Sequence, residues 1–279
     1  MLIDSHQHFW RVDRGDYFWM SPELVPLYRD YGPDDLRPLL SHHGIERTIL
    51  VQAAPTVAET EFMLRIAETT PFVAGVVGWV EFTDPAAPHV MRSLAANSLI
   101  VGFRPMVQDI PDDAWLVRPE LAAAFHTVVE RRLVFDALVL PRHLSHLLIV
   151  ADRHPDLTIV VDHGAKPLIR DGALDPWRSD MAALSARPNT VCKLSGLVTE
   201  ARPDWTVDDL RPYVEHLLDS FGPQRLLWGS DWPVVNLSGG YDRWRATTLE
   251  LLESLSEAEQ AAVLGGNAAR IYLSERGRL

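Results

Sequence analysis

The chain has 279 residues, of which 47% are hydrophobic and 23% charged, a composition that suits a folded protein with a sizeable core. Its formal net charge of −12 argues against nucleic acid or an anionic membrane as a partner. The single cysteine, Cys192, excludes an intramolecular disulfide and favours a reducing compartment.

No basic region followed by a long apolar stretch opens the chain, and no apolar run reaches about 18 residues. We therefore expect a cytoplasmic protein. No low-complexity segment or Gly/Ser-rich linker divides the sequence, so residues 1–279 are expected to form a single domain.

Short β-rich runs alternate with segments of helical periodicity along the chain. The runs are mostly apolar, which is typical of parallel strands that are covered on both faces. The expected strands lie within 2–8, 47–53, 72–80, 99–105, 133–139, 157–163, 190–196 and 225–231. The expected helices are 34–44, 58–70, 86–96, 118–132, 142–154, 177–186, 206–221 and 243–253.

This alternation predicts an α/β fold, a (β/α)8 TIM-type barrel. A doubly wound sheet with extra strands is the main alternative. Most of the β-rich runs end in a polar or reactive side chain, and barrel enzymes build their sites at the C-terminal ends of the strands. The position of the polar residues therefore favours the barrel.

The first run leads into two histidines, His6 and His8. Residues two apart on a strand point to the same side, with Cα atoms roughly 6.6 Å apart. Asp231 ends the eighth run, and strands one and eight are neighbours in a closed barrel. His6, His8 and Asp231 could therefore hold one zinc ion with positions left open for water. Alternatively, Asp231 could act as a general base on water without a metal.

Other polar residues follow the middle runs. His163 ends the sixth run and could complete a metal shell or polarise a carbonyl. Arg104 and Lys166 are cations at strand ends, where they could hold a carboxylate, a lactone oxygen or sugar hydroxyls. Gln108 could join this polar pocket, and Gln52 ends the second run. These residues predict a site for a small polar molecule.

Aromatic and interior charged residues complete the pattern. Trp10 and Trp232 lie beside the predicted catalytic residues and could wall a small-molecule pocket. Lys193 lies inside an apolar run, so an inward-facing ammonium there needs a partner such as a carboxylate or a ligand. Asp136, also inside a run, could pair with Arg104 or Lys193 and be purely structural.

Several motifs together resemble a known family. They are HQHFW, GFRP, DHGAKP, CKLSGLVTEA, FGPQRLLWGSDWPV and GGNAARIY. They resemble the amidohydrolase superfamily, and within it the branch of lactone hydrolases, which includes sugar lactonases such as L-fuconolactonase and L-rhamnonolactonase, and dicarboxylate-lactone hydrolases. The likeness runs from Asp4 to about Tyr272.

The resemblance implies a distorted barrel that hydrolyses a cyclic ester. It implies that Asp231 is the base that activates water, that His6, His8 and His163 line the reacting centre, and that Arg104 and Lys166 lie near the substrate. The expected partner is therefore a small-molecule lactone, and no organic cofactor is expected.

The sequence also departs from the binuclear members of this superfamily. The fourth run offers no lysine to be carboxylated, and the fifth offers Asp136 where a histidine would stand. The pattern therefore favours one divalent ion, zinc, or none. A sugar aldonolactone is the favoured substrate. A dicarboxylate lactone such as a pyrone dicarboxylate, decarboxylation, and a non-catalytic barrel that binds a sugar acid are the alternatives.

Overall fold

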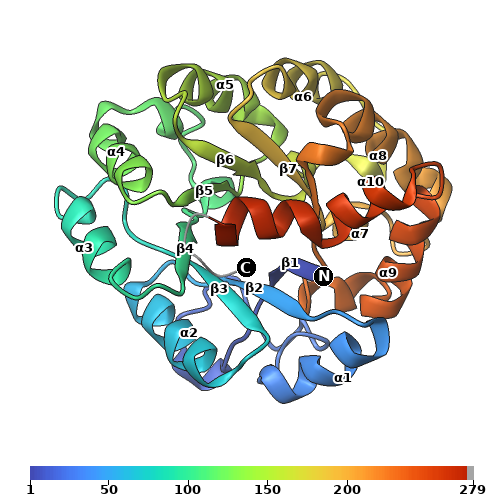
Figure 1. The fold of residues 1–279 in the computed structure, drawn as a ribbon, viewed down its shortest axis with the longest axis horizontal. Coiled ribbons are helices and arrows are strands. Elements are labelled where there is room, and N and C mark those ends of the chain that lie inside the picture. Colours follow the sequence, from blue (N-terminus) through green and yellow to red (C-terminus); the bar gives the residue numbers. More distant parts are fainter. Residues whose placement is uncertain (275–279) are drawn as a thin grey trace.

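The computed structural model of this chain describes residues 1–274. Eight parallel strands follow one another in sequence order around the sheet, and the helices form a ring outside them (Figure 1). A doubly wound sheet would instead reverse its strand order. The predicted (β/α)8 barrel is therefore confirmed. Over the same residues, no helix has the length and apolar character needed to span a membrane.

Each predicted β-rich run contains one strand, and each predicted helix is present. The strands are β1 Ile3–Gln7, β2 Arg47–Val51, β3 Val73–Gly78, β4 Ile100–Phe103, β5 Val134–Ala137, β6 Thr158–Val161, β7 Thr190–Leu194 and β8 Leu226–Trp228. The main helices are α1 Pro33–His43, α2 Val57–Thr69, α3 Ala87–Leu94, α4 Ala122–Glu130, α5 Leu144–Arg153, α6 Trp177–Ser185, α8 Val207–Phe221 and α9 Gly240–Leu251. Shorter helices are α7 Leu197–Glu200 and α10 Glu257–Ala261.

Branched aliphatic side chains fill the interior of the barrel, as in other barrels of this class. They are Ile3, Ile49, Val51, Val77, Val101, Val134, Val160, Val191 and Leu227. Two residues beyond the valines of β5, β6 and β7 stand Asp136, Asp162 and Lys193, which are fully buried. Because side chains two apart share a face, a charged layer lies directly on the apolar one.

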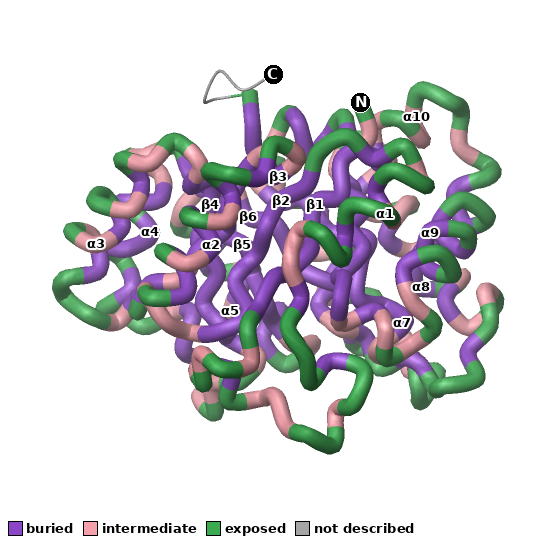
Figure 2. The backbone as a smooth tube through the Cα atoms, turned by 90° about the horizontal axis from the view of Figure 1, so that it is seen from below, coloured by how far each residue is buried: buried purple, intermediate pink, exposed green. Residues whose placement is uncertain are grey.

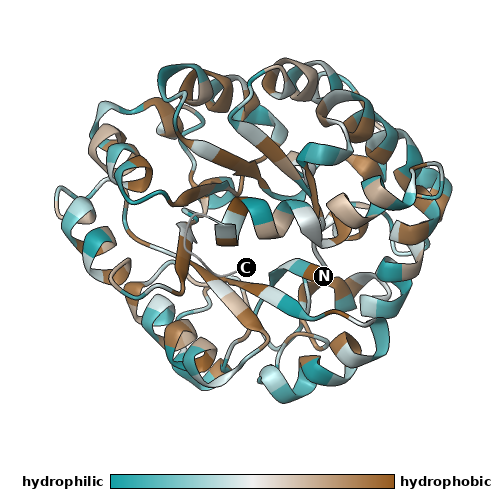
Figure 3. Cartoon of the chain, viewed as in Figure 1, coloured by the Kyte–Doolittle hydropathy of each residue, from teal (hydrophilic) through white to brown (hydrophobic). Residues whose placement is uncertain are grey.

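A second apolar layer lies between the barrel and its helices. In Figure 3 hydrophobic residues dominate the strands, while hydrophilic residues are concentrated on the helices, as burial of one helix face requires. In Figure 2 the buried backbone accordingly runs through the centre and the exposed backbone lies outside.

The C-terminal part of the chain closes one end of the barrel. Its π-helical segment Ala269–Leu273 crosses the centre of Figure 1 and packs Tyr272 and Leu273 against the interior valines. A Cβ at Gly265 would lie 2.3 Å from the carbonyl oxygen of Met1. The backbone at Gly265 therefore packs directly against the residues that precede β1.

The barrel is distorted where its first and last strands meet. Within residues 1–274 no β-ladder joins β8 to β1. Instead, the chain that leaves β8 runs beside the end of β1: the amide of Asp231 donates to the His6 carbonyl at 2.8 Å, and the amide of His8 donates to the Trp232 carbonyl at 2.7 Å. The seam is thus closed by the segment that carries the predicted catalytic residues.

Gly229 permits the close approach at this seam. A Cβ there would lie 2.7 Å from the Cβ of His6 and 3.1 Å from its amide nitrogen. We expect Gly229→Ala to force the two chains apart and to lower the free energy of unfolding by about 1–3 kcal/mol, measured by urea denaturation. Gly266→Ala is the control, because Gly266 is exposed and has room for a methyl group. Equal stabilities of the two variants would contradict this account.

Candidate active site

A cavity of about 220 Å³ opens at the C-terminal ends of the strands. One part of its wall is polar and consists of His8, Arg104, Gln108, His163, Lys166 and Asp231. The other part is apolar and consists mainly of Trp19, Leu24, Leu27, Met106, Leu138, Val234 and Leu237. A cavity with a few converging polar groups on an apolar wall is typical of a small-molecule site.

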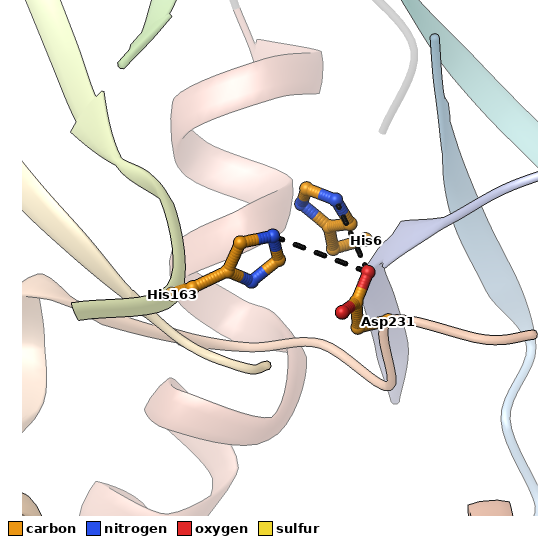
Figure 4. Close-up of side chains that lie close together, drawn as sticks. All are labelled: His6, His163 and Asp231. Atoms are coloured by element: carbon orange, nitrogen blue, oxygen red, sulfur yellow. Dashed lines mark ion pairs between the residues drawn. The ribbon is translucent and has the colours of Figure 1, made fainter. Parts of the chain in front are cut away.

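Three imidazoles surround one carboxylate oxygen in this cavity. Oδ1 of Asp231 lies 3.2 Å from Nε2 of His8, 3.7 Å from Nε2 of His6 and 4.0 Å from Nε2 of His163. Figure 4 shows the rings of His6 and His163 beside the Asp231 carboxylate, with a dashed line from each ring to the carboxylate. The predicted meeting of β1 and β8 therefore brings all four predicted catalytic side chains together.

The backbone that carries two of these side chains is strained. Asp231 has φ = 57°, in the left-handed region that residues other than glycine rarely adopt. The turn Asp162–Ala165 that carries His163 is also left-handed, with φ values of 54° at His163 and 60° at Ala165, and Lys166 follows at 52°. Such strain persists where the surroundings hold it in place, and it is concentrated at functional sites.

Neighbouring groups hold the strained His163 in place. Its Nδ1 lies 2.8 Å from the hydroxyl of Ser195. Gly196 lies so close behind the ring that a Cβ there would be 2.4 Å from Nδ1. Trp177 of α6 donates to the Gly164 carbonyl at 2.6 Å. The direction of the His163 ring is thus fixed from three sides.

The charged layer lies directly beneath His6. The ammonium of Lys193 is 2.5 Å from Asp136, 3.0 Å from Asp162 and 3.1 Å from Nδ1 of His6. Arg104 donates to Asp162 at 3.2 Å and lies 3.3 Å from Nε2 of His6. Because each buried cation has a carboxylate partner, the layer avoids the large cost of an unpaired buried charge.

This environment sets the protonation states in the cavity. Burial lowers the pKa of His6 well below its ordinary value, and the Lys193 ammonium adds to the effect. Burial also lowers the pKa of His163 to about 4. Burial alone would raise the pKa of Asp231, but the surrounding rings of His163, His8 and His6 hold it below its usual range. At neutral pH, His6 and His163 are therefore neutral and Asp231 is a carboxylate.

His8 differs from His6 in what its ring nitrogens face. Nδ1 lies 2.7 Å from the Val51 carbonyl and Nε2 lies 3.2 Å from the Asp231 carboxylate. Both neighbours are acceptors, so a hydrogen bond at either contact needs a proton on His8. The single N–H of a neutral imidazole can serve only one of these two acceptors, whereas His6 faces two cations.

Hydrogen bonds at Trp19 and Glu59 fix the aromatic part of the cavity wall. The indole of Trp19 donates to the Ala53 carbonyl at 2.7 Å. The buried carboxylate of Glu59, in α2, accepts the amides of Ala53 and Ala54. Glu59 thus fixes the loop after β2, and through it the position of Trp19.

Three of the six predicted substrate-binding residues line the cavity: Arg104, Gln108 and Lys166. Lys166 also pairs with Glu200 at 3.4 Å. Arg104 is paired with Asp162 in the charged layer. The polar residues predicted at the ends of β4 and β6 therefore line the same cavity.

The other three lie behind the cavity wall. The fully buried Trp10 donates to the Arg29 carbonyl at 2.8 Å and packs edge-on against Trp19. Trp232 packs edge-on against Tyr31. Gln52 donates to the Arg104 carbonyl at 2.8 Å. These contacts support residues of the cavity wall from behind. That Trp10, Trp232 and Gln52 contact a ligand remains a prediction.

The group of side chains that could hold a metal differs from the predicted set. The donor atoms of His6, His163 and Asp231 all lie within 4.8 Å of one another. His8 is not part of this group, although its Nε2 lies 3.2 Å from Oδ1 of Asp231. His163 instead supplies the second imidazole.

These donors suit a single zinc ion in type and spacing. Zinc bonds of about 2.0–2.2 Å place neighbouring donors of a tetrahedral shell roughly 3.3–3.6 Å apart, close to the distances around Asp231 Oδ1. Ser195 at Nδ1 of His163 is the kind of outer partner that orients a ligating imidazole. The Arg104 guanidinium is the group that an ion at His6 Nε2 would displace.

Sequence reasoning missed most of the apolar wall. Leu24, Leu27, Val234 and Leu237 carry no chemical signature, and their loops have no periodicity that would place them. Trp19 was recognisable only as one aromatic residue near the HxH motif, and its indole contact with Ala53 depends on the path of the loop.

Comparisons with known proteins agree on one family. The amidohydrolase family matches residues 3–273. The L-fucono-1,5-lactonase of Burkholderia ambifaria is 45% identical over 98% of this chain and 96% of its own, and that of Burkholderia multivorans is 40% identical over the same shares. The crystal structure of a Burkholderia multivorans amidohydrolase with bound zinc is 38% identical, with a TM-score of 0.91 over 98% of this chain and 99% of that chain.

The low pKa of His163 predicts a pH-dependent stability. Burial lowers this pKa from 6.5 to about 4, so between these values the unfolded chain binds a proton that the folded chain does not. The free energy of unfolding should therefore fall as pH falls from about 6.5 towards 4. His163→Gln should reduce this slope in urea denaturation at pH 7, 6 and 5. His126→Gln is the control, because His126 is exposed. An unchanged slope in His163→Gln would contradict the assignment.

Proposed function

The chain belongs to the amidohydrolase family, and from this premise we propose that it hydrolyses a sugar aldonolactone to the sugar acid, with L-fucono-1,5-lactone as the first substrate to test. The observation that carries the proposal is the buried Asp231 carboxylate, which faces the cavity among three imidazoles. Two relatives that share at least 40% of this sequence are L-fucono-1,5-lactonases, which supports the choice of substrate.

In the proposed reaction Asp231 acts as the general base. Water attacks the lactone carbonyl carbon while the carboxylate of Asp231 takes one of its protons, giving a tetrahedral intermediate. The bond between that carbon and the ring oxygen then breaks, and the ring oxygen takes a proton from Asp231. The products are the carboxylic acid and the freed hydroxyl of the sugar acid, so Asp231 returns to its starting state.

The imidazoles have distinct parts in this scheme. His8 donates to Oδ1 of Asp231 and keeps the carboxylate aimed at the water. His6 and His163 are neutral beside it. Their Nδ1 atoms contact Lys193 and Ser195, so Nε2 of each ring is the atom left to orient water or the carbonyl oxygen. Because the side chains are buried and held by their neighbours, little reorganisation is needed during the reaction.

The wall of the cavity matches a sugar lactone in its two-sided character. Arg104, Gln108 and Lys166 provide hydrogen-bond donors for ring and exocyclic oxygens on one side. Trp19 and the leucines provide an apolar surface for the carbon-bound hydrogens and any methyl group on the other. This arrangement would hold a ring of modest polarity with its carbonyl directed to Asp231.

We further propose that His6, His163 and Asp231 hold one zinc ion, which would act as a Lewis acid and polarise the lactone carbonyl. The donor set described above supports this, as does the zinc bound in the Burkholderia multivorans structure. Lys193 and Asp162 beneath His6 would then govern how readily its ring serves as a ligand.

The alternatives fit the cavity less well. A dicarboxylate lactone needs free cations, but Arg104 and Lys166, the cations that line the cavity in residues 1–274, already face Asp162 and Glu200. A decarboxylase of this superfamily should carry a metal-binding histidine on β5. Asp136 stands there instead and is held by Lys193 beneath the cavity.

Asp231→Asn tests the general base and separates an enzyme from a sugar-acid binder. We expect kcat for L-fucono-1,5-lactone to fall by at least about 10²-fold, because the carboxamide cannot accept the proton of water. Binding of the sugar acid, measured by calorimetry, should change by less than about threefold. A pH-indicator assay follows acid release. No hydrolysis of any sugar lactone by the native protein would overturn the proposed function, and an active Asp231→Asn would overturn the role of Asp231.

Removal of metal tests the zinc proposal. Elemental analysis of the purified protein should find about one zinc per chain, and His163→Gln should reduce this content because one ligand is lost. The exposed group of His42, His43 and Asp242 also has metal-binding geometry, so His43→Gln is the matched control and should leave the content unchanged. A zinc-free protein with full activity after treatment with a chelator would contradict the proposal.

A further inference from the structure

The carboxylate of Asp4 lies in the seam where β1 and β8 meet without a ladder. Asp4 is fully buried. Its Oδ1 accepts the backbone amide of Ser230 at 2.8 Å and that of His6 at 3.2 Å. Oδ1 of Asp4 therefore holds Ser230, which precedes Asp231, together with His6, whose ring points to Asp231.

The other oxygen anchors this arrangement to the helix layer. Oδ2 of Asp4 accepts the hydroxyl of Tyr241, in α9, at 3.1 Å. Tyr241 packs edge-on against Trp228 of β8 and is itself buried. The position of the carboxylate is therefore fixed from outside the barrel as well as from the seam.

A local irregularity of β1 separates the directions of Asp4 and His6. The pairing of β1 with β2 shifts register between Asp4 and Gln7, as at a β-bulge, which changes the direction of the side chains that follow. Asp4 accordingly contacts Tyr241 on the outer side, whereas the His6 ring points to Asp231, with Nε2 3.7 Å from Oδ1. The amide of His6 lies within this irregular stretch, and Asp4 gives it an acceptor.

The strained conformation of Asp231 makes such a support necessary. At φ = 57° the Cβ of a residue other than glycine is crowded against the following carbonyl oxygen, so this backbone conformation is unfavourable. The amide of Asp231 is held by the His6 carbonyl, and the preceding amide, that of Ser230, is held by Asp4. Two successive peptide groups are therefore fixed to β1 at the place where the chain is strained.

We propose that Asp4 is a positioning residue, whose carboxylate holds Ser230 and His6 together so that Asp231 faces its imidazole partners in the productive geometry. The inference rests on the proposed function for its kinetic readout. Asp4 does not line the cavity, so it acts on the reaction only through the residues it holds.

The kinetic test uses the full chain with L-fucono-1,5-lactone. Asp4→Ala should lower kcat by about 10- to 100-fold, as expected when a catalytic group loses its alignment, and should change KM by less than about twofold. Asp4→Asn should recover kcat to within about threefold of the native value, because its carboxamide oxygen can still accept both amides. All assays are run well below the melting temperature measured for each variant. A native-like kcat in Asp4→Ala would overturn the proposal.

A matched variant at the same seam excludes general loosening. Ser5 of β1 donates its hydroxyl to the Trp228 carbonyl at 2.7 Å, within β8 and away from Asp231. Ser5→Ala should leave kcat within about twofold of the native value. If Ser5→Ala lowers kcat as much as Asp4→Ala, the effect belongs to the seam in general and the assignment to Asp4 is wrong.

A double variant tests whether Asp4 acts through Asp231. In an Asp231→Asn background, Asp4→Ala should lower the residual rate by less than about twofold, because the group that it aligns is already absent. A full multiplicative loss in this background would contradict the proposal.

Amide hydrogen exchange gives a readout that needs no substrate. Asp4→Ala should speed exchange of the Ser230 and Asp231 amides by at least about tenfold, while amides in β5 stay unchanged. Unchanged exchange would overturn the positioning role. Inactive native protein with this exchange pattern would instead indicate that the proposed substrate is wrong and that the structural part of the inference holds.

Discussion

The contact between β1 and the chain that leaves β8 is the constraint on which the candidate site depends. Gly229 has no side chain, so the two segments approach closely enough for the amide of Asp231 to reach the His6 carbonyl. That approach places a carboxylate from one end of the barrel among imidazoles from the other strands. Without this contact, Asp231 would not lie among the imidazoles that lower its pKa.

Beneath this contact, the charged layer shows how the barrel combines a dry interior with a reactive surface. Lys193 and the carboxylates of Asp136 and Asp162 neutralise one another out of reach of water. Their positions follow from the alternation of strand side chains, which places them directly above the interior valines. Burial and the Lys193 ammonium lower the pKa of His6, while the imidazoles around Asp231 keep its carboxylate ionised, so the protein obtains a base and neutral imidazoles side by side.

Much of this arrangement could be predicted from the sequence, because it depends on order along the chain. Apolar runs with polar ends indicated the strands, and the closed order of a barrel brought His6 and His8 near Asp231. What could not be predicted depends on side-chain direction. The possible metal group contains His163 and not His8, because it depends on how closely the ring nitrogens approach one another as well as Asp231. Trp10 supports Trp19 from behind, since an aromatic residue near a motif gives no information about which side of a loop it packs on.

The site draws on residues 223 positions apart in the sequence, and the last turn of the described chain closes the barrel from below. During synthesis on the ribosome, His6 and His8 emerge long before their carboxylate partner. Contacts of such long sequence separation form late in folding, so a chain whose translation stops before β8 has no assembled site. Such a fragment also lacks Leu227, Tyr272 and Leu273, which cover the interior valines, and exposed apolar surface of this kind makes a partly folded chain prone to aggregate.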